Sequence, residues 1–87
     1  MANVSERESS SLHIVLERVD PARNIARYYV LSIEPTLFDE ISLVREWGRI
    51  GKSGGRRIEL HQSYREARIA LNVWLSRKRR RGYELRF

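Results

Sequence analysis

Large apolar residues recur at every second position in two short stretches near the start of the chain, residues 12–17 and 28–33. Because successive side chains of a strand point to opposite faces of a sheet, this alternation predicts two half-buried strands. Between them, residues 20–24 read Asp-Pro-Ala-Arg-Asn, and these residue types favour a tight turn. The two strands are therefore expected to form an antiparallel hairpin. The residues expected on its apolar face are Leu12, Ile14, Leu16, Tyr29, Leu31 and Ile33.

A second hairpin is predicted farther along the chain, after Pro35 ends the second strand. Residues 43–50 alternate as a third strand, and residues 37–42 are left open between a loop and the beginning of that strand. The glycine-rich residues 51–55 predict a turn, and residues 56–61 a fourth strand whose Ile58 and Leu60 are expected to face the core. One face of the third strand carries Leu43, Arg45, Trp47 and Arg49.

The pattern then changes to that of a helix. Ser63 followed by Glu66 is a capping box, worth about 0.5–2 kcal/mol through its cap. An apolar stripe at helical spacing must pack on the sheet, and Gly82 suits the position just after the helix. Residues 83–87 alternate again as a short final strand. The stripe consists of Ala67, Ala70, Leu71, Trp74 and Leu75.

These elements predict an α+β fold, an antiparallel sheet of about four to five strands packed by one C-terminal helix in the order β-β-β-β-α-β. The chain has 87 residues, enough for one small domain. Residues 1–10 are polar, serine-rich and without periodicity, so we expect a flexible N-terminal tail followed by a single domain over residues 11–87.

Several classes of protein are disfavoured by what the sequence lacks. It contains no cysteine, which removes disulfides, thiolate metal sites and cysteine nucleophiles. Its two histidines, His13 and His61, cannot make a zinc site alone, so neither a metal nor a cofactor is expected. There is no apolar signal-peptide region and no apolar run near the roughly 20 residues that cross a bilayer. We therefore expect no membrane partner and a reducing, cytoplasmic location, associated with the nucleoid if the protein is bacterial.

Charge adds the first indication of a partner. The chain carries 17 Lys and Arg against 11 Asp and Glu, a net charge of +6, and 15 of the bases are arginine. The charge is uneven, since residues 1–44 carry a net −3 and residues 45–87 a net +9. Arginine binds phosphate bidentately and stacks on flat surfaces. An anionic partner docking on the C-terminal half is expected, and nucleic acid is the commonest one.

Three segments of the basic half are candidates for nucleic-acid binding. On the third strand, the indole of Trp47 can stack on a base or sugar while Arg45 and Arg49 bind phosphates. Gly48 has no side chain and would let another backbone approach. The alternative is that Trp47 is a core aromatic and Gly48 a bulge residue. The glycine turn and the helix end supply further cations. The candidates are Arg45, Trp47, Gly48, Arg49, Lys52, Arg56, Arg57, Arg77, Lys78, Arg79, Arg80 and Arg81.

The cations of the other two segments also have plainer explanations. Those around the glycine turn fit an ordinary hairpin with solvated charges. Those at the helix end complement the helix dipole or form a patch resembling a nuclear-localisation signal. Five consecutive bases exceed what a dipole requires, which favours binding.

An ordered set of motifs over residues 12–86 resembles the WGR domain family, which is named for the tripeptide at residues 47–49. Tyr-Tyr lies in the second strand, Trp-Gly-Arg-Ile-Gly ends the third, and Ser-x-x-Glu-Ala begins the helix. The chain departs from the family at Gly54-Gly55-Arg56, where many members have Gly-Gln. The resemblance implies DNA binding, as in the DNA-dependent poly(ADP-ribose) polymerases, with Trp47 stacking near a terminal nucleotide and Arg49 contacting the backbone and neighbouring domains.

We therefore expect a non-catalytic module that binds DNA, with duplex ends or nicks favoured. The alternatives are a protein-interaction module that docks on a DNA-repair or other enzyme, or on itself head-to-tail, and a general RNA or single-strand binder. An enzyme is not expected, because no catalytic or metal-ligand constellation has the required spacing and a small core offers little buried pocket. The acids Glu34, Asp39 and Glu40 fit a solvated loop. The oligomeric state stays open.

Overall fold

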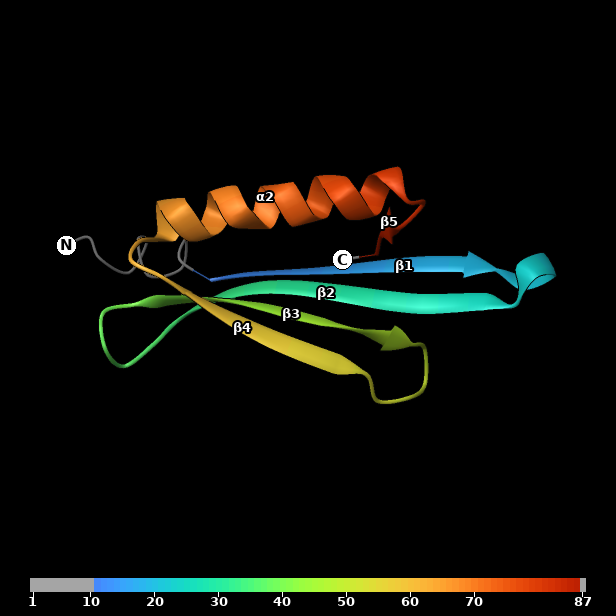
Figure 1. The fold of residues 1–87 in the computed structure, drawn as a ribbon, viewed down its shortest axis with the longest axis horizontal. Helices are drawn as coiled ribbons and strands as arrows, with labels where there is room; N and C mark the ends of the chain where they lie inside the picture. Colours follow the sequence, from blue (N-terminus) through green and yellow to red (C-terminus); the bar gives the residue numbers. More distant parts are fainter. Residues whose placement is uncertain (1–10, 87) are drawn as a thin grey trace.

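The computed structural model describes residues 11–86 as an antiparallel sheet with one helix across it (Figure 1). A turn of 3-10 helix joins the first two strands, and the order across the sheet is β4-β3-β2-β1-β5. The predicted α+β class and chain order are confirmed. The tail expected for residues 1–10 lies outside the described residues. The elements are β1 (Leu12–Asp20), η1 (Pro21–Arg23), β2 (Ile25–Pro35), β3 (Ile41–Arg49), β4 (Gly55–His61), α2 (Tyr64–Arg80) and β5 (Glu84–Leu85).

The first hairpin has the predicted strands and turn. Leu16 lies opposite Tyr29 in β2, and Tyr29 lies opposite Trp47 in β3, so one row of side chains crosses three strands. The sequence pattern leaves residues 37–42 open between a loop and the beginning of the third strand. In the structure the turn continues to residue 40, and β3 begins at Ile41. In the β1–β2 turn, Asn24 adopts the left-handed conformation, with φ of 55°.

The core lies between α2 and one face of the sheet. Alternation in β1, β2 and β3 sends the predicted apolar residues to this face, and the apolar stripe of α2 packs against them. Trp47 and Trp74 are half-buried at the margin of the core. The buried residues of this core cluster are Leu16, Tyr29, Leu31, Ile33, Leu43, Ala67, Leu71 and Tyr83.

The prediction that Ile58 and Leu60 face the core is wrong. These side chains are 52% and 58% exposed, on the sheet face that α2 does not cover. The register places Ile58 opposite Val44, whose side chain points away from the helix, and puts Glu59 beneath the helix instead. An alternation of two apolar and two polar residues cannot say which set is inside, and in β4 the polar set points inward.

The two ends of α2 have the expected chemistry. Ser63 is the N-cap, and its hydroxyl oxygen accepts a hydrogen bond from the backbone N–H of Glu66 at 3.1 Å. The Glu66 carboxylate in turn accepts from the N–H of Gln62, one residue before the cap, at 3.3 Å. After the helix, Gly82 has a φ of +95°, which a residue with a side chain adopts only with strain.

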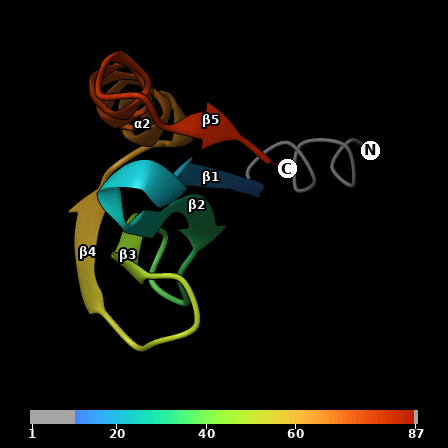
Figure 2. The ribbon, with the colours of Figure 1, turned by 90° about the vertical axis from the view of Figure 1, so that its right-hand side faces the viewer.

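Several segments lie toward the same end of the long axis of the molecule. The end of α2, the β1–β2 turn and the β3–β4 turn all lie at the right of Figure 1, because β3 and α2 run in the same direction. Seen along the long axis, α2 covers one face of the sheet, while the β3–β4 hairpin twists away from the helix toward its turn (Figure 2). No helix in the described residues is long and apolar enough to cross a membrane.

Candidate nucleic-acid interface

Trp47 lies flat between two neighbours on the helix-facing side of β3. Its ring stacks on that of Tyr29, with centroids 6.4 Å apart and planes inclined by 23°. On the other side its register partner is Gly55, where an added Cβ would fall 2.5 Å from two indole carbons. Gly55 is therefore required for the indole to lie across β4. Trp47 contributes to the core margin and keeps part of its surface accessible.

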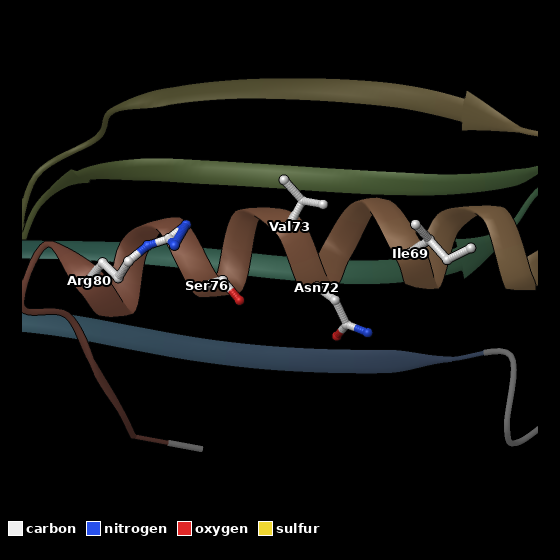
Figure 3. A pocket seen from close by; sticks show the side chains of 5 residues that line it. All are labelled: Ile69, Asn72, Val73, Ser76 and Arg80. Carbon is white, nitrogen blue, oxygen red and sulfur yellow. The ribbon is translucent and has the colours of Figure 1, made fainter.

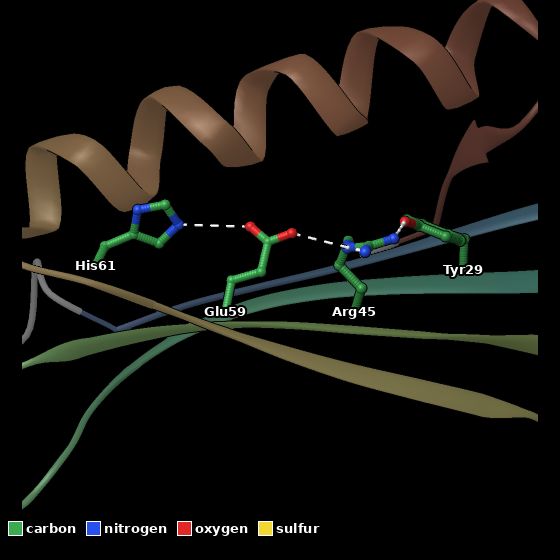
Figure 4. Close-up of polar contacts among 4 residues, drawn as sticks. All are labelled: Tyr29, Arg45, Glu59 and His61. Carbon is green, nitrogen blue, oxygen red and sulfur yellow. Dashed lines mark hydrogen bonds and ion pairs between the residues drawn. The ribbon is translucent and has the colours of Figure 1, made fainter.

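Arg45 lies on the same face, but its guanidinium is turned inward. The side chain is 11% exposed, and the group lies 3.9 Å from the centre of the Trp74 ring and 5.7 Å from that of Trp47. Arg45 Nη1 donates to the Tyr29 hydroxyl at 3.2 Å, and Nη2 lies 3.6 Å from a carboxylate oxygen of Glu59 (Figure 4). Arg45 thus holds the aromatic side chains in place and has little surface for a ligand.

Polar contacts continue from this group along β4. The second carboxylate oxygen of Glu59 lies 3.5 Å from Nε2 of His61, beneath the start of α2 (Figure 4). Burial, opposed by Arg45, raises the pKa of the Tyr29 hydroxyl above its ordinary value. Tyr29 therefore remains a neutral hydrogen-bonding partner at physiological pH. This polar cluster explains why the polar residues of β4 point inward.

Arg49 fastens the end of β3 to the β1–β2 turn. Its Nη1 donates to the backbone oxygen of Asn24 at 3.2 Å, and its Nη2 to the side-chain oxygen of Asn24 at 3.1 Å. Both acceptors are neutral, so the positive charge of Arg49 is not compensated by these contacts. The side chain is exposed.

A row of three arginines crosses the sheet at this end. Arg18 lies opposite Arg27, and Arg27 lies opposite Arg49, all on the helix-facing side. Like charges directly opposite one another destabilise a sheet. Within residues 11–86, no carboxylate oxygen lies within 4.0 Å of these three guanidinium groups. We call Arg18, Arg27 and Arg49 the arginine row.

Sequence reasoning missed two members of this row, because Arg18 and Arg27 belong to the half of the chain with net negative charge. A usable signal was present in the alternation. Arg18 follows Leu16 by two residues and Arg27 precedes Tyr29 by two, so both share the face of those core residues. The sequence pattern does not contain the strand register, which places Arg18 and Arg27 side by side.

The basic run at the end of α2 divides around the helix. Lys78 points toward the sheet, with its Nζ 4.5 Å from the centre of the Tyr29 ring and 5.5 Å from that of Tyr83. The pKa of Lys78 is lowered, mainly because burial disfavours its charged form and also because Arg81 and other arginines lie nearby. Arg77 lies 4.9 Å from the centre of the Trp74 ring. The members that lie exposed to solvent are Arg77, Arg79, Arg80 and Arg81.

The candidates from the glycine turn do not share one face. Arg57 is exposed on the helix-facing side as the register partner of Arg45, and Lys52 is exposed in the turn. Arg56 lies on the opposite face, where its Nε is 3.1 Å from a carboxylate oxygen of Glu46. Gly48 also belongs to that face, and an added Cβ there would lie 3.0 Å from the Cα of Gly54. The close approach expected at Gly48 is therefore made by the chain's own turn.

The arrangement offers groups for stacking and for anion binding. Aromatic rings lie beside a row of uncompensated guanidinium groups at one end of the molecule. Among residues 11–86, no group of three His, Asp or Glu side chains could hold a metal ion.

Comparison with known proteins agrees with the motifs. The family model described as the WGR domain matches residues 12–86. The chain is 47% identical over 79 residues to the uncharacterized protein y4dW of Sinorhizobium fredii (strain NBRC 101917 / NGR234). That alignment covers 90% of this chain and 38% of the relative, so the chain spans well under half of the relative's length. No solved structure matches the chain significantly.

Proposed function

This chain belongs to the WGR domain family, and on that premise we propose that it is a non-catalytic module that binds DNA at duplex ends or nicks. WGR domains of the poly(ADP-ribose) polymerases bind DNA breaks. The observation that carries the proposal is the arginine row beside the half-buried indole of Trp47. An exposed nucleotide at a break offers both a phosphate and a flat surface.

In the absence of a bound anion, charge repulsion within the arginine row destabilises the folded chain. Three guanidinium groups in neighbouring strands repel one another, and Arg18 and Arg27 have no carboxylate partner among the described residues. Neighbouring strands lie about 4.8 Å apart, so the row spans about 10 Å at its Cα atoms. This spacing suits one or two phosphates of a nucleic-acid strand, which would accept bidentate hydrogen bonds and relieve the repulsion.

The other candidates take different roles in this proposal. Trp47 stacks on the terminal sugar or base, and Arg45 is a positioning residue that holds the Trp74 and Tyr29 rings. Arg57 extends the phosphate contacts, together with Arg77, Arg79 and Arg81 at the end of α2. Arg56 is neutralised by Glu46 on the far face, so the proposal assigns it no contact with DNA.

Fluorescence anisotropy with linear, nicked and covalently closed DNA tests the proposal. We expect tighter binding to the linear and nicked forms, weakening steeply with salt. The Arg27→Gln variant should bind more weakly and lose about 0.9 in the slope of log affinity against log salt for each phosphate contact removed. Arg56→Gln is the matched control, because it removes the same charge from the opposite face and should leave the slope unchanged.

Other outcomes would change the assignment. Equal or absent binding to all three DNA forms would contradict end recognition. Equal affinity for single-stranded RNA would indicate sequence-tolerant stacking on an unpaired strand instead. If Trp47→Leu and Arg27→Gln both stay folded by circular dichroism and bind DNA like the original chain, the arginine row is not the DNA site.

A further inference from the structure

The turn between β2 and β3 exposes two large apolar side chains among carboxylates. Leu37 is 93% exposed and Phe38 is 78% exposed. Glu34 lies on one side of this pair, and Asp39 and Glu40 follow it directly. No Lys or Arg occurs between Arg27 and Arg45 in the sequence, so the charges that the turn itself carries are all negative. We call residues 34–40 the acidic turn.

Hydrogen bonds hold the acidic turn in a shape that projects its apolar pair. The N–H of Thr36 donates to the backbone oxygen of Glu40 at 2.9 Å, and the N–H of Phe38 donates to the Thr36 hydroxyl at 3.1 Å. Asp39 has a φ of 61°, which reverses the chain tightly. The turn bends to the side of the sheet opposite α2 (Figure 1). Adjacent large apolar side chains held in solvent are typical of interaction sites.

A second apolar feature lies on the solvent face of α2. Ile69 and Val73 are 57% and 46% exposed, one helical turn apart. They line a shallow groove of about 430 Å³ together with Asn72, Ser76 and Arg80 (Figure 3). Arg65 lies one turn before Ile69 on the same stripe and is also exposed. We call this feature the outer groove, with an arginine at each end and an apolar pair in the middle.

The acidic turn and the outer groove are complementary. The turn presents an apolar pair between carboxylates, and the groove presents an apolar pair between guanidinium groups. We propose that the acidic turn of one copy of this chain docks in the outer groove of a second copy. Leu37 and Phe38 would cover Ile69 and Val73, and the carboxylates would approach Arg65 and Arg80.

The contact can form only between copies. Within one chain, the acidic turn lies on the side of the sheet away from α2, and the outer groove lies on the side of α2 away from the sheet. A chain whose turn is bound still offers an empty groove, so the contact is head-to-tail and further copies can add until a ring closes. The arginine row stays accessible in this arrangement, and the inference holds whether or not DNA binds there. The interface is small, so association should be weak and depend on concentration.

The test begins with the oligomeric state of the full chain. Sedimentation equilibrium between about 10 µM and 1 mM should show an average mass that rises with concentration and falls again in high salt. Leu37→Ser/Phe38→Ser removes the apolar part of the turn, and Ile69→Gln/Val73→Gln removes that of the groove. All four side chains are exposed, so both variants should keep the original thermal unfolding temperature and should each be monomeric alone.

Mixing the two variants gives the decisive measurement. The turn variant keeps an intact groove and the groove variant keeps an intact turn, so an equimolar mixture should form a 1:1 complex of twice the monomer mass and stop there. A mixture that stays monomeric overturns the proposal. So does an original chain that is monomeric over the whole concentration range, or self-association that both variants retain. Each outcome is independent of DNA affinity.

Discussion

The guanidinium group of Arg45 lies 3.9 Å from the centre of the Trp74 ring, which joins β3 to the C-terminal half of α2. The same group contacts the Tyr29 hydroxyl and the Glu59 carboxylate. A cation in the middle of the third strand therefore connects the helix, the core and the inward-facing side of β4. Its removal should affect all three.

Replacing Arg45 with Met should cost about 1–3 kcal/mol in the free energy of unfolding, because Glu59 and the Tyr29 hydroxyl lose their partner. Urea denaturation monitored by circular dichroism measures this loss. The double variant Arg45→Met/Glu59→Gln should recover part of it, since no charge is then left unpaired. Arg79→Met, on the exposed helix surface, is the matched control. Unchanged stability of Arg45→Met would contradict the role we assign to this residue.

Substituting Ala for Gly55 should displace the indole of Trp47, because the new Cβ would lie 2.5 Å from the ring. We expect a loss of about 1–3 kcal/mol, as for other forced insertions into packed sites. In a Trp74→Phe background, fluorescence reports Trp47 alone, and acrylamide should quench it more strongly in the Gly55→Ala variant. At Gly51 no heavy atom lies within 4 Å of an added Cβ, and the φ is +87°. Gly51→Asn strains the backbone of the same turn without any clash with the ring, so it should leave the quenching unchanged.

Lys78 should make stability depend on alkaline pH. Its pKa is lowered in the folded state, mainly by burial, so the folded chain binds this proton less readily than the unfolded chain does. The penalty is present at neutral pH and disappears as pH rises through the lowered pKa toward the ordinary value. The stability of the original chain should therefore increase relative to that of Lys78→Met as the pH rises from neutral toward 10.5, the ordinary pKa of lysine. Urea unfolding of both proteins at several pH values measures the difference, and a constant difference would contradict the burial of Lys78.

The two faces of the sheet should respond differently to truncation. Leu43→Ala removes a fully buried side chain and should cost about 2–5 kcal/mol. Ile58→Ala, on the uncovered face, should cost under about 1 kcal/mol. Thermal and urea unfolding of the two variants compare them directly. An equally large loss at Ile58 would mean that something covers that face in solution.

The local elements could be predicted because each depends on neighbours in the chain. Alternation located β1, β2 and β3, and the Ser63 cap and Gly82 fixed the ends of α2 through hydrogen bonds and backbone angles that are local. The family was indicated by an ordered set of short motifs over residues 12–86, each of which is contiguous in the chain. The boundary of the third strand was less certain, because the end of a turn depends on which residues the partner strand pairs.

The positions of the charged side chains depend on contacts that form only in the folded chain. In β4 the pattern allows either face inward, and the buried guanidinium of Arg45 selects Glu59 over Ile58. Strand register brings Arg18 and Arg27 from the acidic half beside Arg49, while the helical turn separates Lys78 from its basic neighbours. Sequence patterns alone were enough to predict the elements and the net charge. The grouping of charges into an arginine row arises from contacts between residues far apart in the chain, which local patterns do not contain.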